Sequence, residues 1–300
     1  MPVVGWIYSG TDTLTADRLA NFGKGLGEYG YAVDKNLTLE YRTAEGHYDR
    51  LPAMAAELVR RRVAVLIATG GNEPALAAKA ATADIPIVFS TGGDPVEAGL
   101  VVSLNRPGGN ITGFSMVSSV LSAKRLSIIH QLAPGAAVIG GLVNSDYPDA
   151  AQQLRELNEA AAAIKQRFQI VSAATPSGIN SAFASLAEQR VGALLVANDP
   201  FFNDQGAQIT ALAAHYGIPA MYAQRDFVTA GGLASYGPVL SESNVQVGRY
   251  TARILKGEKP ADLPVVLADK FEFVINLKTA KSLGLTVPSS MQLLADEVIE

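Results

Sequence analysis

The chain contains no cysteine, so disulfides, thiolate metal sites and cysteine nucleophiles are excluded. Its only histidines, His47, His130 and His215, are far apart in the sequence, and none has a metal-binding spacing such as HExxH. Charged residues make up only 17% of the 300 residues, and the net charge is −4. A basic face for nucleic acid or for an anionic membrane surface is therefore not expected.

Long hydrophobic runs and familiar catalytic motifs are also missing. No run of about 18 apolar residues occurs, so we expect no membrane-spanning segment. The sequence has no GxxxxGK[ST], no GxGxxG after its first predicted strand and no GxSxG. Gly108-Gly109 lacks the lysine and the strand-to-helix setting of a phosphate loop, and we interpret it as a tight turn. The sequence therefore predicts no cofactor, no metal and no enzymatic activity.

What the chain does contain is a regular alternation of short apolar runs and amphipathic segments. Residues 63–68 form a continuous apolar run, typical of a parallel strand buried on both faces. The spacing of Leu19, Phe22 and Leu26 predicts one buried face of a helix. Strands are expected at residues 3–8, 37–41, 63–68, 85–89, 138–143, 169–173, 193–197, 218–223 and 271–275. Further helices are expected at residues 51–62, 119–132, 149–168, 180–189, 205–216 and 241–255.

Strands that alternate with helices predict βαβ units and parallel sheets. The length of 300 residues corresponds to about two domains, and 48% hydrophobic residues provide material for two cores. Two runs of alternation, separated near residues 114–117, have similar lengths. We therefore predict an α/β protein made of two doubly wound parallel-sheet lobes.

Small polar residues follow one predicted strand after another. Ligands of open parallel sheets bind outside the carboxyl ends of the strands. Glycine lets backbone amides approach a ligand closely, and a following helix N-terminus favours an anionic group. Serine, threonine, aspartate and asparagine are also ordinary helix caps, so a capping role competes at each position. The candidate ligand-binding residues in these loops are Ser9, Thr11, Asp12, Thr69, Gly70, Gly71, Asn72, Ser90, Thr91, Gly92, Asp94, Asn144, Ser145, Asn198 and Asp199.

Charged and aromatic side chains near the strand ends extend this set. Asp94 or Asp199 is suited to an ammonium group, although Asp94 can equally cap the turn that follows it. Arg225 is suited to a ligand carboxylate, or equally to Asp226 or another surface acid. Aromatic rings near strand ends can sandwich a flat ligand or belong to the core. The aromatic candidates are Tyr8, Tyr147, Phe201, Tyr222 and Tyr236.

Motifs in both halves of the chain carry a family resemblance. GDPV at 93–96, GLV at 99–101 and LNRPGGNITG at 104–113 resemble the signature of the ABC transporter substrate-binding family that includes tryptophan-binding TrpX-like proteins. The second half adds DPFF at 199–202, AGGL at 230–233 and SYG at 235–237. It continues with ILKG at 254–257, PADLP at 260–264 and INLKTA at 275–280. The resemblance covers nearly the whole chain.

The resemblance implies a type I periplasmic-binding fold, in which three hinge crossings join two lobes that close on a ligand. It also implies delivery of the ligand to an ABC permease and its ATPase. Combined with the strand pattern, it predicts residues 1–115 and 236–259 for the first lobe. Residues 116–235 and 260–300 are then expected in the second lobe.

From these observations we expect the solute-binding component of an ABC importer. The expected ligand is an amino acid, with aromatic ones favoured because family members of known specificity bind them. The expected protein is a monomer in the periplasm or anchored outside the membrane, and the family's leader is missing from this chain. A ligand-sensing effector domain of the same fold, acting in signalling or regulation, is the alternative.

Overall fold

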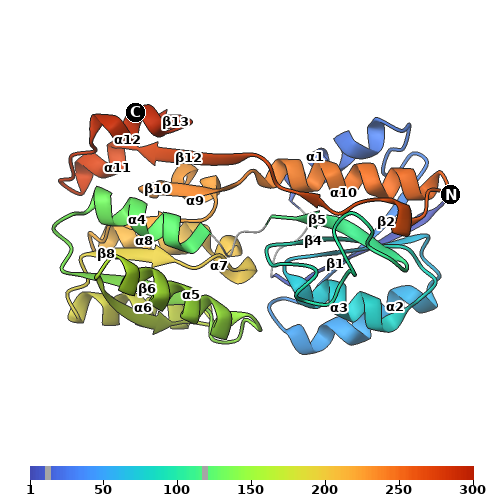
Figure 1. The fold of residues 1–300 in the computed structure, drawn as a ribbon, viewed down its shortest axis with the longest axis horizontal. Helices are drawn as coiled ribbons and strands as arrows, with labels where there is room; N and C mark the ends of the chain where they lie inside the picture. The colour runs from blue at the N-terminus through green and yellow to red at the C-terminus, as the bar shows by residue number, and fades with distance from the viewer. Residues whose placement is uncertain (11–14, 117–120) are drawn as a thin grey trace. The chain divides into compact units, whose positions relative to one another are not determined.

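The computed structural model describes residues 1–10, 15–116 and 121–300, and it divides into two compact units (Figure 1). Unit 1 comprises Met1–Val117 and Val239–Asp269, and unit 2 comprises Ser118–Pro238 and Lys270–Glu300, so the chain passes between the units three times. The largest difference from the expected boundaries concerns residues 260–269, which belong to unit 1. The backbone N–H of Val265 there donates to the Leu104 carbonyl at 2.7 Å.

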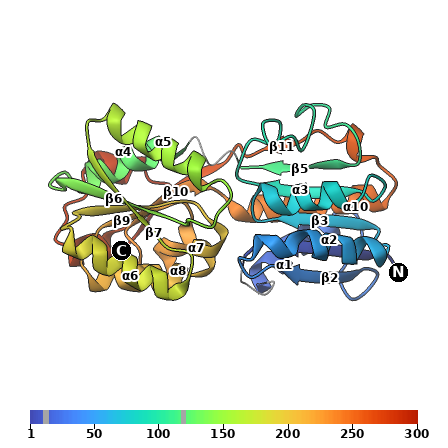
Figure 2. The ribbon, with the colours of Figure 1, turned by 90° about the horizontal axis from the view of Figure 1, so that it is seen from below.

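Unit 1 is built around a six-stranded sheet in the order β11-β5-β4-β3-β1-β2, and all of its strand pairs are parallel (Figure 2). Its strands are β1 (Val3–Tyr8), β2 (Thr38–Thr43), β3 (Val65–Thr69), β4 (Ile87–Thr91), β5 (Ile111–Ser115) and β11 (Val266–Leu267). Its α-helices are α1 (Ala16–Gly27), α2 (Leu51–Arg60), α3 (Asn72–Ala81) and α10 (Leu240–Leu255). Short 3₁₀ turns span Tyr48–Arg50 and Pro260–Asp262.

Apolar side chains cover both faces of the unit 1 sheet. On one face, Trp6 and Ile67 pack with Phe22 of α1 and Val247 of α10. On the other face, strand residues such as Ile7, Leu66 and Phe89 pack with the buried sides of α2 and α3. Figure 1 shows these two helix pairs on opposite sides of the sheet. A continuous apolar run such as that of β3 is what a strand buried on both faces requires.

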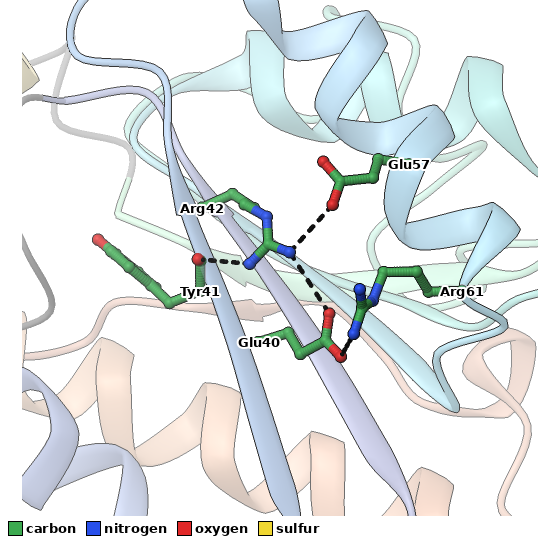
Figure 3. A network of polar contacts seen from close by, with 5 residues as sticks. All are labelled: Glu40, Tyr41, Arg42, Glu57 and Arg61. Carbon is green, nitrogen blue, oxygen red and sulfur yellow. Dashed lines mark hydrogen bonds and ion pairs between the residues drawn. The ribbon is translucent and has the colours of Figure 1, made fainter.

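The edge strand β2 carries charges that are neutralised locally (Figure 3). The Arg42 guanidinium lies 3.0 Å from the Glu57 carboxylate of α2 and 3.6 Å from Glu40 on its own strand. Arg61 contacts Glu40 from the end of α2 at 2.5 Å. The hydrogen bond from Arg42 lowers the pKa of Glu57. Charged side chains on an edge strand disfavour pairing with another chain, so this network protects the open edge of the sheet.

Unit 2 contains a seven-stranded sheet in the order β13-β12-β10-β9-β8-β6-β7. Its pairs are parallel except β10 with β12, which run antiparallel. Its strands are β6 (Val138–Val143), β7 (Arg167–Ser172), β8 (Ala193–Val196), β9 (Ala220–Tyr222), β10 (Ala234–Pro238), β12 (Phe271–Asn276) and β13 (Glu297–Ile299). Its helices are α4 (Ser122–Leu132), α5 (Ala150–Ala163), α6 (Pro176–Glu188), α7 (Pro200–Asp204), α8 (Gly206–His215), α9 (Arg225–Thr229), α11 (Leu277–Ser282) and α12 (Ser289–Leu294).

The main core of unit 2 lies between the sheet and α6, α8 and α9. Phe183 of α6, Ile209 of α8 and Phe227 of α9 pack there against Leu194 and Tyr222 of the strands. Figure 2 shows α4 and α5 on the opposite face of the sheet from α6 and α8. The two sheets, both dominated by parallel pairs and wound with helices, confirm the predicted α/β fold class. Among the helices of the described residues, none has the length and apolarity to cross a membrane.

Candidate functional site

The carboxyl ends of β1, β3 and β4 align three of the predicted residues in one row of the unit 1 sheet. Tyr8 is paired in register with Thr69, and Thr69 is paired with Ser90. All three are buried, and side chains in one row of a parallel sheet point to the same face. The contacts identify that face as the one covered by α1 and α10. The Ser90 hydroxyl lies 2.6 Å from that of Ser243 on α10, and the guanidinium carbon of Arg18 on α1 lies 4.3 Å from the Tyr8 ring centroid.

The single tryptophan of the chain holds the Thr69 side chain in place from the core of unit 1. The Trp6 indole nitrogen Nε1 donates a hydrogen bond to Thr69 Oγ1 at 2.8 Å. Trp6 is fully buried, with its ring centroid 5.0 Å from that of Phe22 and 5.9 Å from that of Tyr41. Trp6 is therefore a core residue whose one polar atom reaches the strand end.

The next row of the sheet carries a second polar set. The Ser9 hydroxyl donates to the Gly70 carbonyl at 2.5 Å, and the Thr91 hydroxyl donates to Asn72 Oδ1 at 2.5 Å. The Gly93 N–H donates to Thr91 Oγ1 at 3.2 Å. Ser9 and Thr91 are fully buried, so their hydroxyls act mainly to shape the loops.

Glycine is required where β3 leaves the sheet. Gly70 has φ +94°, in the left-handed region, and a Cβ there would lie 2.4 Å from Ser9 Oγ. Gly71 follows with φ +116° and stands before α3 without a side-chain cap. Gly71 has no side chain that could cap α3, and a helix N-terminus favours an anionic group.

Asp94 serves the turn that follows it. Its Oδ1 accepts hydrogen bonds from the N–H groups of Val96, at 2.7 Å, and Glu97, at 3.2 Å. Asp94 is exposed, and Gly92, two residues earlier, is half-buried. Of the two roles considered for Asp94 from the sequence, the capping contact is the one observed.

In unit 2, the ends of β6 and β8 meet through Asn144 and Asp199. Asn144 Nδ2 donates to Asp199 Oδ2 at 3.2 Å, and the Phe202 N–H donates to Asp199 Oδ1 at 3.0 Å, which caps α7. Asp199 is fully buried. Burial raises the pKa of its carboxyl to about 6, and the hydrogen bonds from Phe202 and Asn144 oppose this rise. A buried carboxyl that titrates near 6 is sensitive to any charge placed beside it.

The remaining loop residues of unit 2 differ in exposure. Ser145 is exposed, Asn198 is half-buried, and Tyr147 is buried with 8% exposure. The side chain of Gln224 lies beside Asn198, with Nε2 3.5 Å from Asn198 Oδ1. Phe201 is buried, and its ring centroid lies 5.6 Å from that of Phe202, so it contributes to the core.

Three predicted residues have their main contacts within unit 2. Tyr222 is fully buried and stacks on Phe227 with ring centroids 4.6 Å apart. The Arg225 guanidinium pairs with Glu272 at 3.0 Å and Glu297 at 2.7 Å, which corresponds to the surface-acid alternative. The half-buried Tyr236 has ring neighbours in the β12 residues Phe271 and Phe273, whose centroids lie 6.5 and 6.4 Å from its own.

Three polar residues at the strand ends are not among those predicted from the sequence. Arg18 contacts Tyr8 from α1, and Gln224 contacts Asn198. The buried Arg125 of α4 donates from Nε to the Tyr236 carbonyl at 2.7 Å, and burial lowers the pKa of its guanidinium to about 10. Each of them lies within a predicted helix or loop with no motif around it, so only the fold could reveal these contacts.

Two predicted residues, Thr11 and Asp12, lie outside the described residues. Within residues 1–10, 15–116 and 121–300, no group of three or more histidine, aspartate or glutamate side chains is placed to hold a metal ion. The polar groups at the strand ends include hydroxyls, amides and the buried carboxyl of Asp199, which are suited to hydrogen bonding of a small polar molecule.

The chain forms two doubly wound units and passes from one to the other three times. This arrangement defines a two-unit ligand-binding protein of the type I periplasmic class. Residues 12–299 match the model of the family of ABC transporter substrate binding proteins. The chain belongs to this family, as its motifs predicted, and the family consists of binding proteins.

Relatives support the same assignment. A tyrosine-binding protein of Clostridioides difficile is 30% identical over 266 residues, which are 88% of this chain and 75% of the relative. A conserved domain protein of Vibrio cholerae has a TM-score of 0.88 at 28% identity, with 99% of both chains covered. An ABC domain from Streptococcus pneumoniae, solved in complex with L-Trp, has a TM-score of 0.86 at 26% identity, again with 99% of both chains covered.

Proposed function

We propose that this chain is the extracytoplasmic solute-binding component of an ABC importer and that its ligand is an aromatic amino acid. The observation that carries the proposal is the row of Tyr8, Thr69 and Ser90 at the carboxyl edge of unit 1, which combines an aromatic ring with hydroxyl groups. Two similar proteins are named or solved with aromatic amino acids, namely tyrosine and L-Trp.

In this proposal, unit 1 receives the ligand carboxylate. The Thr69 hydroxyl and the N–H groups at the start of α3 are donors, and donors stabilise an anion. The Tyr8 ring, held under Arg18, provides an aromatic surface beside those donors. The candidate loops 9–12, 69–72 and 90–94 would thus recognise the carboxylate, which all amino acids share, and the flat aromatic side chain.

Unit 2 contributes the opposite charge. Asp199 is the buried carboxyl at the edge of that sheet, and Asn144 connects it to the end of β6. The Asp199 carboxylate would stabilise a ligand ammonium placed near this pair. The ammonium would in turn lower the pKa of Asp199 from about 6. We therefore propose that the strand-end loops of unit 2, including Asn198 and Tyr147, also take part in ligand binding.

The proposal further includes delivery of the unchanged ligand to a membrane permease. A binding protein of an importer works outside the cytoplasmic membrane, either free or anchored to it. It needs no catalytic groups, because transport requires only that the ligand is captured and released. Monomeric behaviour remains our expectation for the purified protein.

Isothermal titration calorimetry with a panel of amino acids, and with glucose as a sugar control, tests this function. We expect heat with a stoichiometry near one from L-tyrosine, L-tryptophan or L-phenylalanine, and weaker or no heat from aspartate, lysine and glucose. Tyramine and tryptamine, which lack the carboxylate, serve as matched controls and should lose most of the affinity. If no aromatic amino acid produces heat, the ligand proposal is wrong.

A further inference from the structure

The hydrogen bond between Trp6 and Thr69 connects the core of unit 1 to its strand end. It joins side chains 63 positions apart in the sequence, at 2.8 Å between Nε1 and Oγ1. Trp6 cannot turn away from this contact, because it is fully buried between Phe22 and Tyr41. An indole N–H only donates, so Thr69 must be the acceptor in this bond.

A hydroxyl group has one hydrogen to donate and two lone pairs to accept. The Trp6 N–H occupies one lone pair of Thr69 Oγ1, which leaves the Thr69 hydrogen for another partner. A hydroxyl that already accepts a hydrogen bond is also a better donor, because hydrogen bonds in a chain polarise one another. Thr69 therefore offers a donor at the end of β3, where it retains 8% exposure.

The neighbouring hydroxyls are used differently. Ser9 donates its hydrogen to the Gly70 carbonyl, and Thr91 donates its hydrogen to Asn72. Ser90 shares a hydrogen bond with Ser243. The side-chain partner of Thr69 is instead a donor, in contrast to the acceptors that Ser9 and Thr91 contact.

We propose that Trp6 is a positioning residue for the ligand. Its N–H fixes the Thr69 hydroxyl as a hydrogen-bond donor, and that hydroxyl donates to the carboxylate of the bound amino acid. This inference rests on the proposed function, and it assigns to a buried residue, remote from the ligand, a role in recognising the carboxylate. The Trp6 ring itself does not touch the ligand.

A double-mutant cycle measured by calorimetry tests the inference. Thr69→Val removes the donor and should weaken binding of the aromatic amino acid about tenfold or more, as expected for a hydrogen bond to a charged group. Trp6→Phe should weaken binding about threefold to tenfold in the wild-type background. It should have less than about a twofold effect when Thr69 is already valine, because Trp6 then has no hydroxyl to orient.

A second variant guards against a folding defect in Trp6→Phe. Because the chain has one tryptophan, biosynthetic replacement of tryptophan changes position 6 alone. Replacing it with β-(benzothiophen-3-yl)alanine keeps the shape of the ring and substitutes sulfur for the N–H. This protein should show the same loss of affinity while keeping the packing against Phe22 and Tyr41.

Tyr250→Phe is the matched control. It removes a side-chain hydrogen bond to the Pro264 carbonyl in the same unit, so it should lower stability without changing affinity. The single indole ¹⁵N–H resonance adds a direct readout, and we expect it to shift on ligand addition in wild type but not in Thr69→Val.

The outcomes separate the two proposals. If the wild-type protein binds no amino acid, the proposed function fails and the role of Trp6 fails with it. If the wild type binds but the effects of the Trp6 and Thr69 substitutions simply add, Trp6 acts independently of Thr69 and only this inference is overturned. An affinity unchanged by the benzothiophene replacement overturns it in the same way.

Discussion

The carboxyl of Asp199 combines two roles that a sequence motif cannot separate. It caps α7 through the Phe202 N–H, and it accepts a hydrogen bond from Asn144 at the neighbouring strand end. Complete burial raises its pKa from 3.8 to about 6. A carboxyl with a raised pKa destabilises the folded state whenever it is ionised, so the cost of burial appears in the pH dependence of stability.

We predict that Asp199 makes unit 2 less stable as the pH rises from about 4 to about 6. In this range the folded state binds a proton that the unfolded state has lost, so the free energy of unfolding falls with pH by on the order of 2–3 kcal/mol. Urea denaturation of wild type and Asp199→Asn at several pH values measures this. The difference between the two proteins should change across that range, and a constant difference would contradict the raised pKa.

Arg225 is predicted not to bind the ligand. Its guanidinium is engaged by Glu272 and Glu297, and its side chain is 42% exposed, so the pairs contribute at most about 1 kcal/mol. Arg225→Gln should lower the free energy of unfolding by no more than that and leave the affinity for the best amino acid within about twofold. A loss of affinity above tenfold in calorimetry would return Arg225 to the binding site.

Among the elements, α1 and α10 approach each other so closely that two of their residues have no room for a Cβ atom. A Cβ on Gly25 of α1 would lie 2.0 Å from the Val245 carbonyl oxygen of α10, and one on Gly248 of α10 would lie 2.2 Å from that of Phe22. Both obstacles are backbone atoms, which cannot rotate away. The two glycines therefore set the distance between the helices that cover the face of Trp6 and Thr69.

Two alanine substitutions in α1 should have opposite effects. Gly25→Ala forces the helices apart and should cost about 1–3 kcal/mol of stability. Gly23→Ala, two residues earlier in the same helix, meets no atom within 4 Å and should stabilise the protein by about 0.5–1 kcal/mol through helix propensity. Thermal unfolding of the two variants checks the pair, and similar effects in both would contradict the close approach.

The sequence pattern predicted the presence of most long strands and helices, whereas it did not predict several of the residues where they end. The strands expected at 3–8 and 138–143 match β1 and β6, because apolar runs of that length have one reading in a doubly wound chain. The helix expected at 149–168 ends at Ala163, because Lys165 adopts φ +55° and the N–H groups of Lys165 and Gln166 close the helix. Without a glycine there, the sequence carried no stop signal.

Short or interrupted elements escaped prediction for a physical reason. Strand β5 contains Gly113, where a Cβ would lie 2.2 Å from the Phe89 carbonyl oxygen, and the glycine favoured a boundary rather than a strand interior. Helices α7 and α9 span only five residues each, too few for a periodic pattern. Their formation depends on tertiary packing of residues such as Phe202 and Phe227.

For the molecule as a whole, the topology made the grouping of strand-end residues predictable but not their contacts. Parallel strands deliver their carboxyl ends to one edge, so the sequence could nominate Tyr8, Thr69 and Ser90 before their shared row was known. The partners of these residues, such as Trp6 and Arg18, come from distant segments and became visible only in the structure. Which of the nominated residues contact ligand remains a prediction.

The central proposal is that the strand-end loops of this chain bind an aromatic amino acid. Hydrogen–deuterium exchange, with and without the aromatic amino acid that binds best, tests it most directly. We predict slower exchange of backbone amides at residues 69–75 and 90–94 in unit 1 and at residues 144–147 and 198–203 in unit 2. Protection confined to one unit, or absent from these loops at saturating ligand, would contradict the account.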